Sequence, residues 1–224
     1  MIATSTRNCQ LVPLCALLGL ALLTCVGFAP GTERQQTGEK QAWRIVFDGK
    51  TLANWKSANF GGEGKVYVEG GKIMLDTGVT LTGITWTGGD IPRMNYEINL
   101  QAMKVSGDDF FCGLTFPVGD SPCSLIVGGW GGTVVGLSSI DDQDASENET
   151  TTSMDFAHGR WYRIRVRVTP KKIEAWIDDE NVIAAVTTGH KISIRPEVSL
   201  SRPLGIATWK TEAALRDIKL RKLD

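Results

Sequence analysis

One stretch decides the fold: it reads Tyr96-Glu97-Ile98-Asn99-Leu100-Gln101-Ala102-Met103, with apolar side chains at every second position. A period of two is typical of a strand with one buried and one exposed face. A second stretch repeats the pattern, because it reads Trp161-Tyr162-Arg163-Ile164-Arg165-Val166-Arg167-Val168. Both stretches are therefore predicted to be half-buried antiparallel strands.

Short apolar runs bounded by Gly-Gly, Asp-Gly and Pro continue on both sides of these stretches. Further strands are expected at 43–47, 66–68, 72–75, 80–86, 109–117, 123–129, 133–137, 172–177, 182–186, 204–208 and 214–220. Many short strands without an alternating helix pattern predict an all-β fold of two stacked antiparallel sheets, a jelly-roll sandwich spanning 43–224.

The composition excludes several other classes of protein. Of the 224 residues 25 are Gly, above the usual share of about 7 %, which argues against a helical bundle. The 24 Lys and Arg are matched by 25 Asp and Glu, so there is no basic field to hold nucleic acid. With 42 % hydrophobic and 22 % charged residues, wholesale disorder and a polytopic membrane protein are excluded as well.

Residues 1–30 differ from the rest, because Arg7 is their only charge and an apolar run follows it. The pattern predicts a secretory signal peptide, and hence an exported protein, periplasmic or extracellular, with no stable membrane span after cleavage. Leu22-Leu23-Thr24-Cys25 resembles a lipobox, so a lipid anchor is the alternative. Residues 31–42 are expected to form a flexible tether.

Removal of the leader leaves Cys112 and Cys123 as the thiols of the mature chain. If their hairpin is centred between residues 117 and 118, the two cysteines lie directly opposite each other. An oxidising compartment then favours a Cys112–Cys123 disulfide, and two buried thiols are the alternative.

An acidic run, Asp141-Asp142-Gln143-Asp144-Ala145-Ser146-Glu147-Asn148-Glu149, follows a glycine-rich segment. Crowding raises the pKa of a carboxylate, so Asp142 or Glu147 is a candidate acid or base. Oxygen ligands also suit a hard cation, which makes Asp141, Asp142 and Asp144 a candidate Ca²⁺ site. A solvated acidic loop is the alternative. No other cofactor is indicated.

Trp130 has glycine on both sides, in Gly128-Gly129-Trp130-Gly131-Gly132. Its ring is left unshielded and can stack on the C–H face of a pyranose, so Trp130 is a candidate sugar-binding residue. The alternative is a ring folded back on the edge of the sandwich.

The hairpin around residues 169–172 predicts a ladder of charges on one sheet face. Arg167 is expected opposite Glu174, Arg165 opposite Trp176 and Arg163 opposite Asp178. This ladder can be purely structural. If its face is the concave one, Glu174 becomes a catalytic candidate and Arg165 and Trp176 become sugar-binding candidates. His158, in a turn, is a further candidate for proton transfer near neutral pH.

Several segments resemble the 3-keto-disaccharide hydrolase domain family, which is abundant in environmental bacteria. They are Phe47-Asp48-Gly49-Lys50-Thr51-Leu52 with Trp55, the segment Gly107-Asp108-Asp109-Phe110-Phe111, Gly159-Arg160-Trp161-Tyr162, and Leu215-Arg216-Asp217-Ile218-Lys219-Leu220. The resemblance implies a sandwich similar to concanavalin A-like lectins and glucanases, with a concave sheet facing carbohydrate. Typical members also carry a Tyr-Glu-x-Gln-like strand and a basic residue after the Phe-Phe-like pair. Here Cys123-Ser124-Leu125-Ile126 and Cys112-Gly113 stand in those places.

The resemblance implies an exported hydrolase of 3-keto-disaccharides or related keto-glycosides. A ketone at C3 acidifies the C2 hydrogen, so a base can form an enolate that expels the C1 substituent. The chemistry requires a base, a donor or cation for the enolate oxygen, and an acid for the leaving group. Two alternatives remain: a non-catalytic carbohydrate-binding module and an envelope interaction protein.

Overall fold

The computed structural model describes residues 41–224. Its two decisive strands, β6 (Tyr96–Ser106) and β11 (Trp161–Val168), pair antiparallel, with Tyr162 opposite Ala102 and Val168 opposite Tyr96. All four of these side chains are buried, whereas the arginines between them along β11 are at least partly exposed. The predicted alternation is therefore confirmed.

These two strands belong to a sheet that also contains β1 (Arg44–Ile45), β3 (Val66–Glu69), β4 (Lys72–Leu75), β12 (Lys172–Ile177), β13 (Glu180–Val186) and β15 (Glu212–Lys222). The order of its strands is β13-β12-β11-β6-β15-β4-β3, and β1 pairs with β15.

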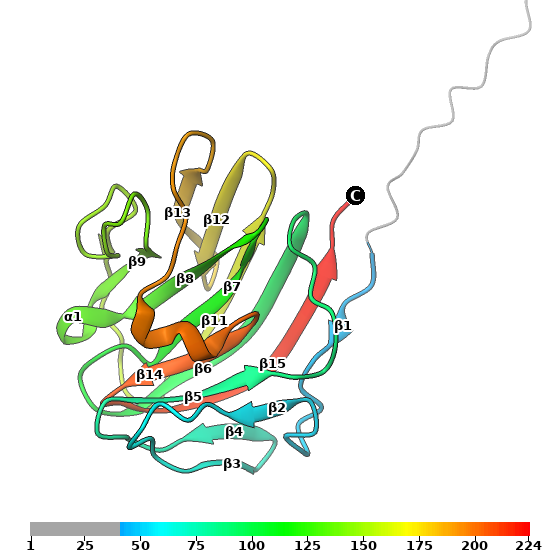
Figure 1. Ribbon diagram of the computed structural model, residues 1–224. Helices are drawn as coiled ribbons and strands as arrows, with labels where there is room; N and C mark the ends of the chain where they lie inside the picture. Colours follow the sequence, from blue (N-terminus) through cyan, green and yellow to red (C-terminus); the bar gives the residue numbers. More distant parts are fainter. Residues whose placement is uncertain (1–40) are drawn as a thin grey trace, which may run out of the picture. The chain divides into compact units, whose positions relative to one another are not determined.

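The second sheet contains β2 (Trp55–Ser57), β5 (Leu81–Trp86), β7 (Cys112–Val118), β8 (Ser121–Gly128), β9 (Val134–Ser138), β10 (Thr152–Ser153) and β14 (Gly205–Trp209). Its order is β10-β9-β8-β7-β14-β5-β2. All pairings in both sheets are antiparallel, and the sheets lie face to face (Figure 1). The predicted all-β jelly-roll sandwich is thereby confirmed.

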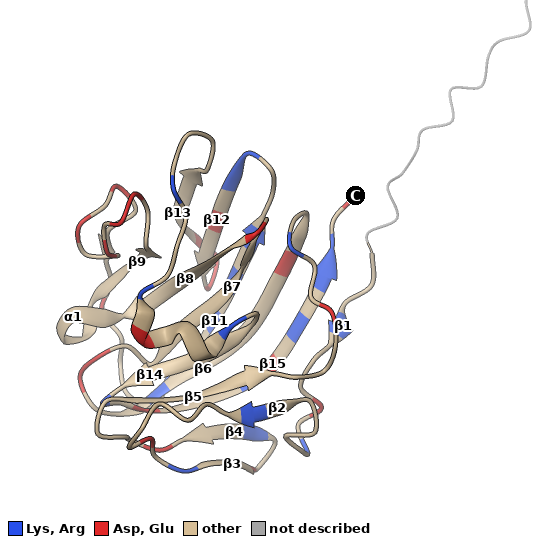
Figure 2. Ribbon diagram, viewed as in Figure 1, with Lys and Arg blue, Asp and Glu red and all other residues tan. Residues whose placement is uncertain are grey.

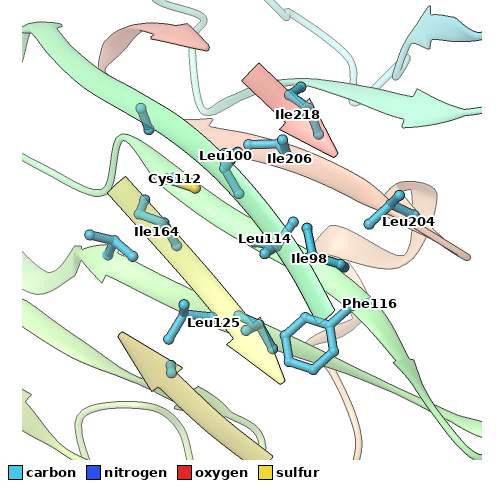
Figure 3. Close-up of a cluster of buried hydrophobic side chains, with 14 of the residues drawn as sticks. Ile98, Leu100, Cys112, Leu114, Phe116, Leu125, Ile164, Leu204, Ile206 and Ile218 are labelled. Carbon is cyan, nitrogen blue, oxygen red and sulfur yellow. The ribbon is translucent and has the colours of Figure 1, made fainter. Parts of the chain in front are cut away.

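A hydrophobic core fills the space between the sheets, and Figure 3 shows part of it. Leu100 from the eight-stranded sheet and Leu114 and Leu125 from the seven-stranded sheet are fully buried there. Each such side chain stabilises the fold by about 1.5–3 kcal/mol. Because side chains alternate along a strand, Gly113 and Ser124 face the opposite, outer side of the seven-stranded sheet.

The expected signal peptide and most of the expected tether lie outside the described residues. Within the described part of the chain, no helix is long and apolar enough to cross a membrane. The only helical pieces there are α1 (Gly129–Gly132) and the 3-10 helix η1 (Pro196–Ser201).

The predicted disulfide is wrong, because Cys112 and Cys123 are both free and buried. The β7–β8 hairpin turns at Gly119-Asp120, and the ladder continues through a Pro117–Pro122 pair. Cys112 consequently faces Val127, four residues along β8 from Cys123. At about 3.4 Å per residue this offset is roughly 14 Å, beyond the reach of a disulfide.

Candidate functional site

A long connection between β13 and β14, residues 187–204, crosses the outer face of the seven-stranded sheet (orange in Figure 1). We call it the strap. Ser193 exchanges two backbone hydrogen bonds with Ser139, of 2.7 and 3.0 Å. Farther along, the Thr85 hydroxyl of β5 donates to the Leu200 carbonyl at 2.6 Å. The strap is thus fastened to both sides of the sheet.

A cavity of about 280 Å³ lies between the strap and the sheet. This volume is near the lower end of the range for small-molecule sites. Its lining combines apolar and polar side chains from both sides: Leu81, Asp109, Phe110, Ser124, Ile126, Trp130, Ser138, Arg195, Glu197, Val198 and Trp209.

The strand register determines which side chains form the floor of the cavity. Ile126 of β8 stands in one row with Gly113 of β7 and Ala207 of β14, and the Phe110 ring lies over Gly113, which has no side chain. Ser124 of β8 and Ser138 of β9 stand opposite each other in the next row. The β8 run in which the resemblance implies a glutamate therefore presents only a hydroxyl and an aliphatic side chain to the cavity.

Trp130, which the sequence analysis named as a candidate sugar-binding residue, lines this cavity. Its backbone is in the left-handed region, with φ 50° and ψ 55°, inside the short turn α1. The neighbouring glycines have no side chains to cover its ring, and the residue is 43 % exposed. Trp209 and Phe110 add two further aromatic side chains to the lining, so the cavity offers flat apolar surfaces of the kind that stack on sugars.

Asp109 is the first polar group of the cavity, and sequence reasoning missed it. It precedes β7, and its Oδ1 accepts a hydrogen bond from the Phe110 amide at 2.7 Å, while its own amide donates to the Thr211 hydroxyl. None of the ion pairs within residues 41–224 includes it. Asp109 is thus a half-buried carboxylate free to act on a ligand.

Arg195 of the strap is the second polar group of the cavity, and sequence reasoning missed it as well. Its guanidinium lies 2.6 Å from an Asp144 oxygen and 3.0 Å from a Glu197 oxygen. The hydrogen bond from Arg195 lowers the pKa of Glu197, and the same bond raises the pKa of Arg195. The cavity therefore holds a fixed cation with an ionised partner, and Asp144 secures it to the acidic loop.

None of the residues of the acidic loop (red beside β9 in Figure 2) is part of the cavity lining. Asp141 pairs with His190 at 2.7 Å and Asp142 pairs with Lys191 at 2.7 Å, so both fasten the strap. The Glu147 side chain is exposed. No group of three or more His, Cys, Asp or Glu within residues 41–224 is arranged to hold a metal ion. The structure thus does not gather Asp141, Asp142 and Asp144, and Ca²⁺ binding stays a prediction.

The arginine ladder has the predicted register, with Arg167 opposite Glu174 and Arg165 opposite Trp176. The Arg165 guanidinium stacks 3.9 Å from the centroid of the Trp176 ring. This face, however, belongs to the outer side of the eight-stranded sheet, whereas the cavity lies on the seven-stranded sheet. A catalytic role of Glu174, or sugar binding by Arg165 and Trp176, would require a second site.

Sequence reasoning also missed Glu97, at the centre of this ladder. Its carboxylate is fully buried, and it accepts hydrogen bonds of 2.7 Å from both Arg167 and Arg221. Burial alone would raise the pKa of Glu97, but these hydrogen bonds outweigh it and lower the pKa. The charged groups of the ladder therefore pair with one another.

His158 is exposed, and its Nε2 pairs with the Gly107 carbonyl at 2.9 Å. It therefore braces the loop that leads to Asp109 and does not line the cavity. Of the predicted site residues only Trp130 lies in the cavity lining, with Asp144 behind it. Asp109 carried a signal, since it stands in the Gly-Asp-Asp-Phe-Phe segment of the resemblance. Arg195, Glu197 and Trp209 carried none.

Comparison with known proteins agrees with this architecture. Residues 42–221 match the profile of the 3-keto-alpha-glucoside-1,2-lyase-like domain. No curated protein sequence matches significantly.

Among solved structures, a suspected glycosyl hydrolase from Parabacteroides distasonis ATCC 8503 superposes with a TM-score of 0.54 at 16 % identity, covering 81 % of this chain and 94 % of that one. A laminarinase from Flavobacterium sp. UMI-01 gives 0.53 at 14 %, covering 82 % and 100 %. A galectin-like protein from Bacillus subtilis gives 0.53 at 10 %, covering 76 % and 90 %. At such identities the likeness shows the fold alone, one that carbohydrate-active proteins share.

Proposed function

The chain belongs to the 3-keto-alpha-glucoside-1,2-lyase-like family, and from this premise we propose that it cleaves the glycosidic bond of 3-keto-disaccharides or related 3-keto-glycosides. One observation carries the proposal: the cavity joins an unpaired carboxylate, Asp109, to a fixed cation, Arg195, between aromatic walls. These are two of the three groups that the reaction requires.

In the proposed mechanism Asp109 is the base that removes the proton from C2. Asp109 forms no ion pair within the described residues, whereas the hydrogen bond from Arg195 lowers the pKa of Glu197 and makes Glu197 a poor base. Arg195 stabilises the negative charge that develops on the C3 oxygen. The enolate then expels the substituent at C1, and addition of water to the product completes hydrolysis.

Binding is assigned to the walls and the floor. The exposed ring of Trp130 stacks on the sugar, and the hydroxyls of Ser124 and Ser138 offer donors and acceptors for sugar hydroxyls. The apolar leader at residues 1–30 supports the further proposal that the enzyme acts outside the cytoplasm.

The test compares a 3-keto-disaccharide with its unoxidised parent, each incubated with the purified protein and followed by NMR. Cleavage of the keto sugar alone is the expected result, since only the ketone acidifies C2. Shifted resonances without turnover would instead indicate a carbohydrate-binding module. Equal cleavage of both sugars would contradict the elimination mechanism and indicate ordinary glycoside hydrolysis.

A further inference from the structure

The cavity is chemically divided along the order of the strands. Its β9 and β8 side presents the hydroxyls of Ser138 and Ser124 beside Ile126, and these hydroxyls also pair with Asp144 and Thr115. Its β14 and β5 side presents the side chains of Trp209 and Leu81, and the strap adds Val198 above them. One half of a ligand therefore meets polar groups and the other half meets a hydrocarbon surface.

The apolar half is a built surface. Leu81, Val198 and Ala207 form a buried cluster of their own, separate from the main core, and Phe110 and Trp209 pack against it while only partly buried. A flat apolar group placed there would cover both aromatic rings. A second sugar ring would instead bring hydroxyls against groups that cannot pair with them, which is unfavourable.

Asp109 lies at the boundary of the two halves, because it precedes β7, the strand between β8 and β14. This is where a base is required if the sugar occupies the polar half and its C1 substituent the apolar half. The side chains of Leu81, Phe110 and Val198 carry no proton for a departing oxygen. A leaving group that is stable as an anion suits such a wall, and a phenolate is one, since phenols have a pKa of about 10.

We propose that the substrate of this cavity is a 3-keto-glycoside of a phenol, with the sugar on the serine side and the aryl group against Leu81, Val198 and Trp209. This inference rests on the proposed function and narrows its substrate class. Asp109 takes the C2 proton, the electron pair of the C2–H bond forms the C1=C2 double bond by way of the enolate, and the C1–O bond breaks. The aryloxide leaves with the bonding pair and takes up, through water, the proton that Asp109 removed from C2, so Asp109 is restored and no further reactant is needed.

The first test measures turnover of two substrates by the unaltered protein: 3-keto-phenyl glucoside, by release of phenol, and a 3-keto-disaccharide. We expect kcat/KM to be at least about tenfold higher for the phenyl substrate, the factor that about 1.4 kcal/mol provides. Equal or faster cleavage of the disaccharide would overturn the inference and leave the proposed function standing. No cleavage of either would contradict the proposed function.

The second test is independent of turnover and measures the Kd of unoxidised phenyl glucoside and methyl glucoside by calorimetry. The phenyl compound is expected to bind about tenfold more tightly. Equal Kd values would overturn the inference whatever the turnover result.

Two residues of η1 supply a matched pair of variants, because Val198 is buried in the cavity lining while Leu200 is 49 % exposed outside it. Val198→Asn is expected to weaken phenyl glucoside binding about tenfold and so to remove the preference for the phenyl compound, while the Kd of methyl glucoside stays unchanged. Leu200→Asn should change neither. Equal weakening of both ligands by Val198→Asn in a folded protein would contradict the assignment, and the comparison on unaltered protein does not depend on the variant's folding.

Discussion

Replacement of Glu97 by Gln tests whether the buried carboxylate holds the outer face of the eight-stranded sheet together. Glu97 is fully buried and accepts two hydrogen bonds of 2.7 Å, from Arg167 and Arg221 on the neighbouring strands β11 and β15. Gln has the same size, but its amide group turns one acceptor into a donor that faces a guanidinium. The variant thus removes the charge and leaves the packing.

The expected loss of folding free energy depends on how far the two arginine partners of Glu97 are exposed to water. Breaking a fully buried ion pair costs about 3–5 kcal/mol. The Arg167 and Arg221 side chains are 34 % and 16 % exposed, so water solvates part of the charge that is left behind, and we expect about 2–3 kcal/mol. For a domain of this size that corresponds to a fall in Tm of roughly 5–10 °C.

Urea unfolding followed by tryptophan fluorescence measures the loss, and Glu69→Gln, an exposed residue of the edge strand β3, is the matched control. Because the folded pKa of Glu97 lies below the unfolded one, its contribution is present above about pH 4.5 and is lost as pH falls through the folded pKa. The variant should therefore lose this acid sensitivity. Equal stability of both variants at pH 7 would refute the reasoning.

Three further predictions follow from single contacts. The His190 Nδ1–H donates a hydrogen bond to the Asp141 carboxylate, which raises the pKa of His190. This contact is complete below the ordinary pKa of about 6.5 and is lost as pH rises through the folded value. Asp141→Asn should therefore lower the pKa of His190 in an NMR titration, and an unchanged titration would contradict this account. Burial raises the pKa of Cys112 and Cys123 to about 12, so iodoacetamide should alkylate neither thiol in the native protein and both after unfolding, as measured by peptide mapping. Recovery of a Cys112–Cys123 disulfide would disprove the strand register that keeps the two thiols apart. Trp130→Ala should raise KM about two- to tenfold from the loss of about 0.5–1.5 kcal/mol of stacking, and an unchanged KM would remove Trp130 from the sugar site.

The strands could be predicted because burial on one face imposes a period of two that the sequence displays directly. The predicted 172–177 coincides with β12, and the ladder of Arg165 on Trp176 has the predicted register. The register of the β7–β8 hairpin could not be predicted in the same way. The expected strands at 109–117 and 123–129 leave Pro122 in a loop, yet the pairing continues through Pro117 and Pro122 to a two-residue turn.

The site was less accessible to sequence reasoning than the fold. Trp130 could be identified from the sequence because the glycines on both sides of it indicate an unshielded ring. The strap has no periodicity, so nothing local indicates that Arg195 and Glu197 lie over the sheet. Their position depends on tertiary contacts with Asp144 and Ser139, from a loop about fifty residues away in sequence. The most acidic segment of the sequence does not form the site: its Asp141 and Asp142 hold the strap through ion pairs with His190 and Lys191.

The central claim is that Asp109 removes the C2 proton, and two neighbouring variants test it directly. Asp109→Asn keeps an oxygen to accept the Phe110 amide, and Asp108→Asn is an exposed control outside the cavity lining. The measurement is the turnover rate of a 3-keto-glycoside with ligand binding recorded in parallel. The account predicts a fall of about 10²–10⁴-fold in kcat for Asp109→Asn with binding retained, and full activity for Asp108→Asn. Wild-type kcat in the Asp109→Asn variant would contradict it.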